Sequence, residues 1–430
     1  MAYNHAKCAE DPREVRASCV PVAQNPAKCT PGLTACSAEY LRWQLKSAIP
    51  IHAVPYTCSM KLVFASDSFK GTLSSVQTCS LLQEAALEAF PSAECVSVPI
   101  ADGGGGTLDA LAVARPGQLV SIIANNGLMK PIRCKILICG DEAFVESASM
   151  CGLVHIPEED RDPLQTSSSG VGECIAHALY HGCKHITVGL GDSCMNDGGM
   201  GCMSALGVRF YDEAGRDLVG NGKNMERIAC IDESGLIPQA REATFTLMND
   251  VTNPLLGPTG ATYVFGRQKG ADDAALERLE AGMRHYADVL HESHPEIDFD
   301  TPGYGAAGGL AMGLAVFLGA QIESGVETLL QWVDFDGLLQ GADLVVTGEG
   351  QLDGQSLRGK VVSGVAAHAH KAGVPVAVIC GQSLLDENQV AGLGVSRVIE
   401  TGAGLSPEEA MARAQETYMH AARKLFASLA

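Results

Sequence analysis

The sequence predicts an α/β fold with mainly parallel sheets. Short apolar runs alternate with longer helical patterns from Met60 to the end of the chain, as they do where buried strands are joined by helices. No segment repeats at a fixed period, which argues against a solenoid. With 430 residues, the chain is long enough for two or three domains, each with its own core.

The expected strands are short apolar runs that end in turn residues, and the expected helices carry apolar residues three and four positions apart. Strands are expected at residues 62–65, 96–100, 136–138, 185–188, 245–247, 344–346 and 374–379. Helices are expected at residues 76–90, 172–181, 274–291, 364–371 and 407–429. Residues 305–322 carry no charge, but they are mostly Gly and Ala with few large aliphatics, so we expect a buried helix there and not a membrane span.

The composition excludes several classes of protein. Hydrophobic residues make up 46% of the chain and charged residues 19%, which is too apolar for a disordered protein. Thirty basic against fifty acidic residues give a net charge of −20, so we expect neither nucleic acid nor a membrane as a partner. The sixteen cysteines form no C-x-x-C pair and no secretory signal opens the chain, which favours reduced thiols in a cytoplasmic enzyme.

Residues 1–59 differ from the rest of the chain. They hold five of the sixteen cysteines and six of the nineteen prolines, without a sustained apolar period. A strong strand pattern begins directly after them, at Met60. We therefore expect a loosely ordered N-terminal extension, or a start codon placed too early, and we assign no chemistry to this segment.

Acidic and glycine-rich loops follow five of the expected strands. These loops are residues 66–71 (SDSFKG), 101–107 (ADGGGGT), 189–199 (GLGDSCMNDGG), 248–257 (MNDVTNPLLG) and 347–354 (TGEGQLDG). In open α/β sheets, ligands bind beyond the carboxyl ends of the strands. Turns need Gly and Asn, but they do not need repeated carboxylates. The loops therefore predict one site that is assembled from distant segments.

The residues of these loops suit phosphate and a divalent cation. Lys70 lies just before an expected helix, and both a cation and a helix N-terminus favour a phosphate or carboxylate group. Asp197 is a candidate for holding Mg²⁺ or for accepting a hydroxyl proton. Glu349 and Asp353 are followed by Lys360, and oxygen ligands beside a cation suit a metal–phosphate pair.

Two glycine motifs resemble nucleotide-binding loops without their usual context. Residues 354–360 end in Gly-Lys, but Val361 stands where a phosphate-binding loop has Ser or Thr. Gly303, Gly305 and Gly308 satisfy G-x-G-x-x-G, although no strand precedes them as it does in a dinucleotide-binding fold. A glycine loop at a helix N-terminus can still bind phosphate.

Several long motifs together resemble the bacterial type I glycerate kinase family, in the family's order and over residues 60–430. The motifs are MKLVFASDSFKGTLSS, ADGGGGT, GLGDSCMNDGG, NDVTNPLLGPTGATYVFGRQKGA, GYGAAGGL and ADLVVTGEGQLDGQSLRGK. The resemblance implies ATP-dependent phosphorylation of D-glycerate, typically to 2-phosphoglycerate. It also implies two α/β domains with the active site in the cleft between them: a discontinuous Rossmann-like domain, 60–130 plus 300–430, and an inserted domain, 131–299.

Residue type and loop position suggest a role for each candidate. We expect Lys70 to neutralise a phosphate or carboxylate and Asp197 to orient or deprotonate the attacking hydroxyl, as the catalytic pair. Asp102, Glu349 and Asp353 are the candidate ligands of Mg²⁺. The candidate substrate- and phosphate-binding residues lie in the quoted motifs and are Asp67, Ser68, Asn196, Asp250, Asn253, Lys269, Gly303, Gly305, Gly308 and Lys360. Among them, Lys269 and Lys360 are expected to pair with ATP phosphates.

Two motifs depart from the family pattern. Gly105 stands where the family usually has Glu, and Asp192, Cys194 and Met195 stand in a motif that usually reads GLGGSATNDGG. A lost carboxylate would weaken metal or substrate binding, and an added one would repel an anionic substrate unless it points away. These departures leave open a catalytically weakened glycerate-binding or sensor protein, and the glycine motif at 303–308 leaves open a dinucleotide-dependent oxidoreductase.

Overall fold

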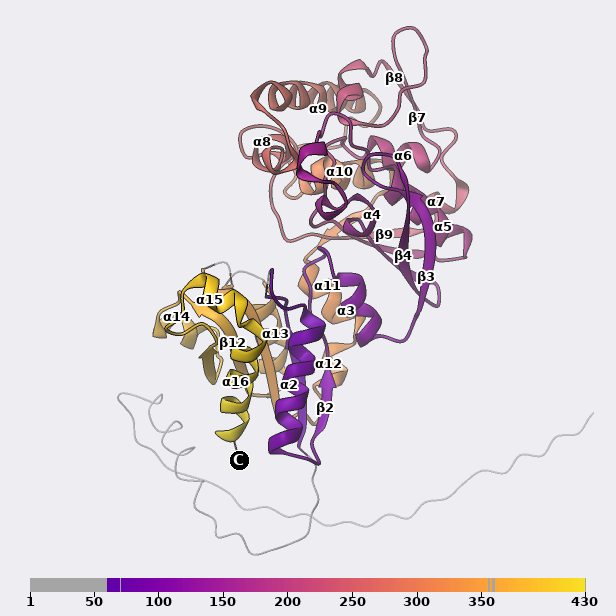
Figure 1. Ribbon diagram of the computed structural model, residues 1–430. Coiled ribbons are helices and arrows are strands. Elements are labelled where there is room, and N and C mark those ends of the chain that lie inside the picture. Colours follow the sequence, from indigo (N-terminus) through magenta and orange to yellow (C-terminus); the bar gives the residue numbers. More distant parts are fainter. Residues whose placement is uncertain (1–59, 70, 355, 358–359, 430) are drawn as a thin grey trace, which may run out of the picture. The chain divides into compact units, whose positions relative to one another are not determined.

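The computed structural model describes residues 60–69, 71–354, 356–357 and 360–429. They belong to one unit, residues 58–430, which contains two large β-sheets (Figure 1). The predictions made for residues 1–59 and for Lys70 lie outside the described residues.

A five-stranded sheet, parallel throughout, is built from the two ends of this unit. In spatial order its strands are β13 (Arg397–Glu400), β12 (Val376–Ser383), β11 (Leu344–Leu352), β1 (Lys61–Ser66) and β2 (Glu94–Ser97). Successive side chains of a strand point to opposite faces, so Leu62 and Phe64 enter one core cluster while Val63 and Ala65 enter another. The sheet is therefore covered on both faces.

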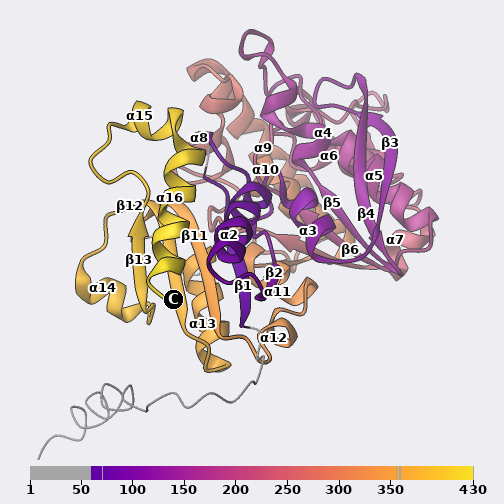
Figure 2. The same cartoon turned by 60° about the horizontal axis from the view of Figure 1, so that its bottom comes forward.

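Helices from both ends of the chain cover this sheet. α2 (Ser75–Ala89) and α16 (Ala414–Ala427) lie side by side on one face, as Figures 1 and 2 show. α13 (Val361–Lys371) and α11 (Gly325–Trp332) pack against the other face. The remaining helices of this part are α3 (Thr107–Ala114), α12 (Phe335–Leu338), α14 (Glu387–Gly392) and α15 (Pro407–Ala412). Residues 407–429 thus form two helices, α15 and α16, where one was expected.

A six-stranded sheet lies in the middle of the sequence. Its strands in spatial order are β10 (Gln321–Glu323), β9 (Thr244–Met248), β6 (His185–Gly189), β5 (Glu142–Glu146), β4 (Pro131–Cys139) and β3 (Gln118–Asn125). The pairings from β10 to β5 are parallel, and those from β5 to β3 are antiparallel. The predicted α/β fold with mainly parallel sheets is confirmed. The antiparallel strand β3 was missed because its buried and exposed residues largely alternate, and β4 was expected only over its apolar part, 136–138.

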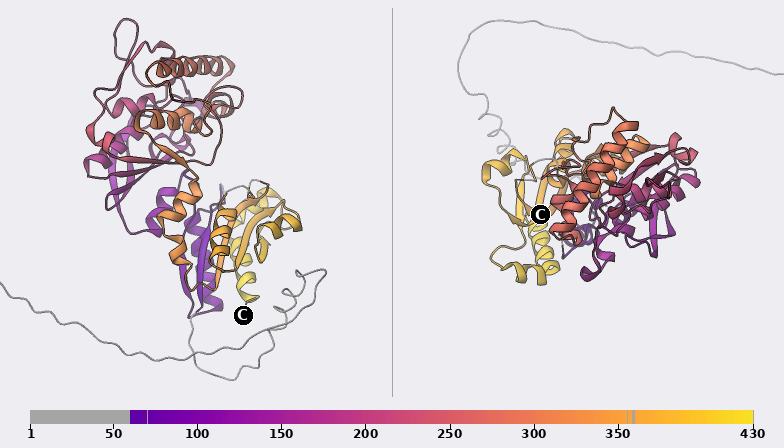
Figure 3. Two further views of the ribbon diagram at one scale, coloured as in Figure 1. Left: turned by 180° about the vertical axis from the view of Figure 1, so that it is seen from behind. Right: turned by 90° about the horizontal axis from the view of Figure 1, so that it is seen from above.

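Helices of this second part enclose its core. The long helix α9 (Asp273–Ser293) lies at the top of Figure 1 and of the left view of Figure 3. The other elements are α4 (Ala148–Cys151), α5 (Ser169–Tyr180), α6 (Met200–Ala205), α7 (Pro238–Glu242), α8 (Ala261–Phe265), α10 (Ala306–Leu318), the short strands β7 (Arg209–Tyr211) and β8 (Cys230–Asp232), and the 3₁₀ turns η1 (Leu153–His155), η2 (Glu158–Asp160), η3 (Gly222–Arg227) and η4 (Arg267–Lys269).

The bounds of the second sheet differ from the predicted insertion. β3 begins at Gln118 and β10 ends at Glu323, so the segment that builds the six-stranded sheet extends beyond 131–299 at both ends. The division into two domains itself stays a prediction.

The charge-free segment 305–322 forms the buried helix α10 and then strand β10. Inside α10, the residues from Ala307 to Gly309 take left-handed backbone angles. A Cβ at position 308 would lie 2.1 Å from the carbonyl oxygen of Met195, so only glycine fits there. No helix in the described part of the chain is long and apolar enough to cross a membrane.

Candidate active site

A cavity of about 740 Å³ opens at the carboxyl ends of β1, β11, β12 and β13. Seven of the residues singled out in the sequence line it: Asp67, Ser68, Asp102, Asp250, Glu349, Asp353 and Lys360. The structure therefore brings four of the five acidic loops together, at the edge of the sheet where α/β proteins bind their ligands.

Six of the residues that line this cavity carry a carboxylate: Asp67, Asp102, Asp250, Glu349, Asp353 and Glu400. Asp67 lies between β1 and α2, and its Oδ1 accepts a hydrogen bond from the Ser68 N–H at 2.6 Å. Burial, together with the nearby Asp102 carboxylate, raises the pKa of Asp67 to about 7. Burial also raises the pKa values of Asp250 and Glu349. Burial is the main cause of all three shifts, and a neighbouring carboxylate adds to each of them.

One carboxylate oxygen in the cavity has no hydrogen-bond donor among the described residues. Glu349 Oε1 is buried, and no described residue forms a hydrogen bond with it. Lys360 counteracts the pKa rise of both Glu349 and Asp250, so its positive charge acts on both sides of the cavity. Lys360 also directly precedes α13, whose N-terminus favours an anion. Both anion- and cation-binding groups therefore face the same space.

The far wall of the cavity was not predicted from the sequence. Gln382 at the end of β12 and residues 400–405 after β13 line it as well. Residues 400–405 combine an acid with glycines after a strand, which is the pattern that identified the other loops. It was missed because β13 is only four residues long and largely exposed, so no strand was expected before it.

The glycine-rich loop 102–106 is held by carboxylates of this chain. Gly104 N donates to Asp102 Oδ1 at 3.2 Å, and Gly105 N donates to Asp192 Oδ2 at 2.9 Å. Gly106 N and Leu108 N both donate to Glu146 Oε1 at 3.0 Å, which caps the start of α3. Three successive amides of this loop are therefore already paired within the protein.

Comparisons with known proteins show the family of this chain. The sequence profile of the glycerate kinase family matches residues 62–430. The chain belongs to this family. The glycerate kinase of Bacillus subtilis strain 168 is 38% identical over 373 residues, which cover 86% of this chain and 98% of that protein. The glycerate 2-kinase of Escherichia coli K12 is 38% identical over 375 residues, with coverages of 86% and 98%.

A solved structure supports the same assignment. The crystal structure of a Salmonella typhimurium LT2 protein assigned as glycerate kinase 2 matches with a TM-score of 0.75 and 38% identity, over 86% of this chain and 98% of that one. The resemblance drawn from the motifs is confirmed, and so is the prediction of an enzyme. The oxidoreductase alternative receives no support from membership of a kinase family.

Two of the departures from the glycerate kinase pattern, Gly105 and Asp192, are in direct contact. Asp192 directs its carboxylate at the Gly105 amide, and it is not among the residues that line the cavity. The added negative charge is therefore paired with a backbone N–H. A Cβ at position 105 would lie 3.5 Å from Asp192 Oδ2, so the two positions share one small space.

Three expected site residues are buried away from the cavity. Asp197 is fully buried and accepts four hydrogen bonds: at Oδ2 from Ser168 N (2.8 Å), Ser168 Oγ (2.8 Å) and Gly201 N (3.1 Å), and at Oδ1 from Gly199 N (3.1 Å). Burial raises its pKa, and these bonds oppose the rise. Asn196 Nδ2 donates to Thr262 Oγ1 at 3.2 Å. The neighbouring Met195 and Met200 are also fully buried. These two apolar residues are the feature of the sequence that could have indicated that this stretch enters the core.

Lys269 is also part of this interior. Its Nζ donates to the carbonyl oxygen of Met195 at 2.7 Å, and burial lowers its pKa to about 8. The expected pairing of Lys269 with ATP phosphates and the expected contact of Asp197 with a substrate hydroxyl do not fit these positions. Both side chains instead bind loops of the second part of the fold.

The glycine motif at 303–308 is also used within the protein. Gly303 N and Gly305 N both donate to the carbonyl oxygen of Asn253, at 3.2 Å and 3.0 Å. The side-chain amide of Asn253 donates to the carbonyl oxygen of Thr259 at 2.7 Å. The expected phosphate cradle at Gly303, Gly305 and Gly308 is therefore not formed in this conformation, because these contacts stabilise the loop before α10.

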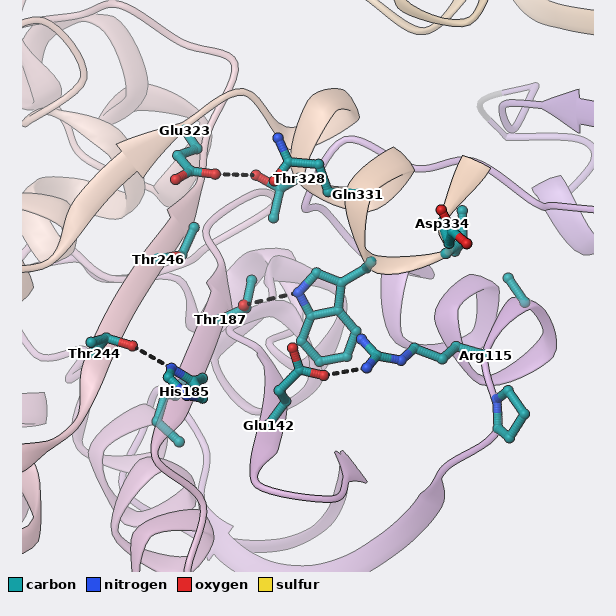
Figure 4. Close-up of a pocket in the computed structure, with 15 residues that line it drawn as sticks. Arg115, Glu142, His185, Thr187, Thr244, Thr246, Glu323, Thr328, Gln331 and Asp334 are labelled. Atoms are coloured by element: carbon teal, nitrogen blue, oxygen red, sulfur yellow. Dashed lines mark hydrogen bonds and ion pairs between the residues drawn. The ribbon is translucent and has the colours of Figure 1, made fainter. Parts of the chain in front are cut away.

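A second cavity, of about 550 Å³, lies beside the amino-terminal ends of three strands of the six-stranded sheet (Figure 4). His185, Thr244 and Glu142, the first residues of β6, β9 and β5, line it. The Arg115 guanidinium pairs with Glu142 and lies 4.8 Å from the ring centre of Trp332. None of the residues singled out in the sequence reaches this cavity, and ligands of α/β sheets bind at the carboxyl ends. The first cavity is therefore the candidate active site.

Proposed function

We propose that the chain transfers the γ-phosphoryl group of ATP to D-glycerate and forms 2-phosphoglycerate, in the cavity at the carboxyl ends of the five-stranded sheet. The observation that carries this proposal is the convergence of seven predicted residues on one cavity. Its volume of about 740 Å³ lies in the range of small-molecule sites. The names of the relatives, glycerate kinase and glycerate 2-kinase, supply the substrate and the product.

The donor groups of the cavity fit Mg²⁺ that arrives with ATP. Among the described residues, no three His, Cys, Asp or Glu side chains form a ready-made metal site. Mg²⁺ commonly needs only one or two carboxylates, because phosphate oxygens and water complete its shell. Glu349, whose Oε1 has no partner in the described part of the chain, and Asp102 are the residues that would hold it. When bound, Mg²⁺ would neutralise charge on the transferring phosphoryl group.

The protein groups would mainly bind and orient the reactants, since phosphoryl transfer depends mostly on positioning and electrostatics. Lys360 would pair with ATP phosphates. Asp67 takes the place that Asp197 cannot fill, because it faces the cavity and can accept a hydrogen bond from the attacking hydroxyl. Lys70 follows the cavity residue Phe69 and would neutralise the carboxylate of glycerate.

The test is coupled ADP release by the full chain with MgATP and D-glycerate. We expect turnover of about 1–100 s⁻¹, as in other kinases, and ³¹P NMR should show phosphate on the 2-hydroxyl. Glycerol, which has hydroxyls but lacks the carboxylate, is the matched control and should give no turnover. Turnover that does not depend on glycerate would refute the proposal. Thermal stabilisation by glycerate without turnover would favour a binding protein instead.

A further inference from the structure

We infer that Asp192 is a positioning residue that holds the glycine-rich loop 102–106 and thereby places Asp102 in the cavity. This inference rests on the proposed function for its kinetic test, whereas the contact itself stands on the geometry alone. Asp192 belongs to the loop after β6 of the six-stranded sheet, while the glycine-rich loop leads from the β2 region into α3.

The contact between the two loops is close and specific. Asp192 Oδ2 accepts the Gly105 N–H at 2.9 Å. A Cβ at position 104 would lie only 2.8 Å from the same oxygen, so the loop needs a glycine there to admit the carboxylate. Gly191 N donates to the carbonyl oxygen of Gly103 at 3.1 Å, which adds a second bond between the same two loops.

This contact reaches the cavity through one further hydrogen bond. Gly104 N donates to Asp102 Oδ1 at 3.2 Å, and Asp102 lines the cavity. Asp192 therefore fixes the amide next to the one that orients Asp102. If the 105 amide loses its acceptor, the 104 amide can turn, and the Asp102 carboxylate loses its fixed direction.

Asp192 itself is exposed, and its backbone has a φ of 57°. An exposed hydrogen bond contributes little to global stability. The left-handed backbone is strained for most residues, but Asp tolerates it and Gly prefers it. A substitution at this position should therefore affect the orientation of the loop much more than the melting temperature.

Positions 105 and 192 should also be coupled. A Cβ at position 105 would lie 3.5 Å from Asp192 Oδ2, so a glutamate there would place a second carboxylate beside the first. Like charges at this separation repel each other. Replacing Asp192 with glycine would remove the repulsion, relieve the left-handed backbone and leave space for the new carboxylate.

The first experiment compares D192A, D192N and the wild type in kcat, in KM for both substrates and in melting temperature. We expect D192A to lower kcat at least fivefold with a melting temperature within about 2 °C of wild type. D192N should keep kcat within about twofold, because its amide oxygen can accept the same hydrogen bond. D217A removes an exposed carboxylate on the loop between β7 and β8 and should change neither value.

Two results would overturn the inference. If D192A and D192N both lower KM for glycerate and leave kcat unchanged, Asp192 acts only as a repulsive charge. If D192A lowers the melting temperature and leaves kcat unchanged, its role is only structural. D192N would separate these cases, because it removes the charge and keeps the acceptor.

The second experiment uses the coupled pair. We expect G105E to lower kcat/KM at least tenfold. The double variant G105E/D192G should have a kcat/KM at least threefold higher than that of G105E. Additive effects of the two substitutions would overturn the coupling. Absent turnover by the wild type would refute the proposed function, and not this contact. The affinity for MgATP, measured by calorimetry, would then replace kcat/KM. We expect D192A and G105E to bind MgATP more weakly, and G105E/D192G to recover the affinity.

Discussion

Replacing Asp197 with asparagine should destabilise the protein without stopping catalysis. Asp197 is fully buried, and its two oxygens accept four hydrogen bonds from Ser168, Gly199 and Gly201. These bonds join the N-termini of α5 and α6. No described residue of the cavity is among its partners. A role in binding the attacking hydroxyl would predict the opposite result, a stable protein with little activity.

The size of the effect follows from the four donors. The amide oxygen of asparagine can replace Oδ2 and keep the bonds from Ser168 and Gly201, but its NH₂ group then faces the Gly199 N–H. A buried donor left without an acceptor costs about 1–3 kcal/mol. Weaker bonds to a neutral oxygen add about 1–3 kcal/mol, and the relief of burying a charge offsets part of this sum. We expect a net loss of about 2–4 kcal/mol, or about 3–5 °C in melting temperature for a chain of this size.

The assay is thermal unfolding together with kcat at 25 °C. D197N should melt lower and keep kcat within threefold of wild type. S168A is the matched variant, because it leaves the Asp197 carboxylate in place and removes one donor. It should cost about 1–2 kcal/mol. The double variant should lose less stability than the sum of the two single losses, because both changes affect the same contact.

A large loss of activity without a loss of stability in D197N would contradict the interior role of Asp197. A general base that is removed lowers kcat by about 10²-fold or more. If D197N loses that much activity and melts within 1 °C of wild type, Asp197 reaches the substrate and the interior role assigned to it is wrong.

Three further outcomes are expected. The pKa of Asp67, raised to about 7, means that the folded protein binds more protons than the unfolded chain between about pH 4 and 7, so its free energy of unfolding should fall as the pH rises through that interval. In Mg²⁺-free buffer, D67N should show a smaller fall in melting temperature from pH 5 to 8 than wild type, and an equal fall would contradict the assignment. G308A should destabilise by more than 3 kcal/mol because its Cβ would meet a carbonyl oxygen at 2.1 Å, while G140A, also at positive φ but in open space, should cost only about 1 kcal/mol; equal melting temperatures would argue against this. E349Q should weaken Mg²⁺ binding in the presence of ATP about tenfold by calorimetry without lowering the melting temperature, and unchanged affinity would exclude Glu349 as a ligand.

The sequence predicted the parallel sheet and the cavity well because both follow from local patterns. The apolar runs at 62–65 and 344–346 are central strands buried on both faces, and such strands read as continuous hydrophobic stretches. Acidic residues placed directly after them, such as Asp67 and Glu349, are carried to the same edge of the sheet by the parallel topology alone. No knowledge of the distant contacts was needed.

The remaining features depend on tertiary contacts that a local pattern does not contain. The loop with Asn196 and Asp197 also follows a strand and also carries glycines, yet its side chains turn into the core beside Met195. β3 and β13 were missed because one-sided or short strands give no continuous apolar run. Gly308, in the left-handed interior of α10, has no room for a Cβ because the carbonyl oxygen of Met195, more than a hundred positions away in the sequence, occupies that space.

The acidic residues at the strand ends differ in what their oxygens face. Asp197 accepts four hydrogen bonds, so its negative charge is used to hold loops. Glu349 Oε1 is buried and has no donor among the described residues, so its lone pairs remain available to a cation. Between these extremes are cavity residues that also accept one backbone amide, namely Asp67, Asp102 and Asp250. Asp197 gains no further partner when a substrate arrives, whereas Glu349 is stabilised by Mg²⁺. Substitution of Asp197 should therefore act through the shape of a loop, and substitution of Glu349 through the affinity for the metal–nucleotide complex.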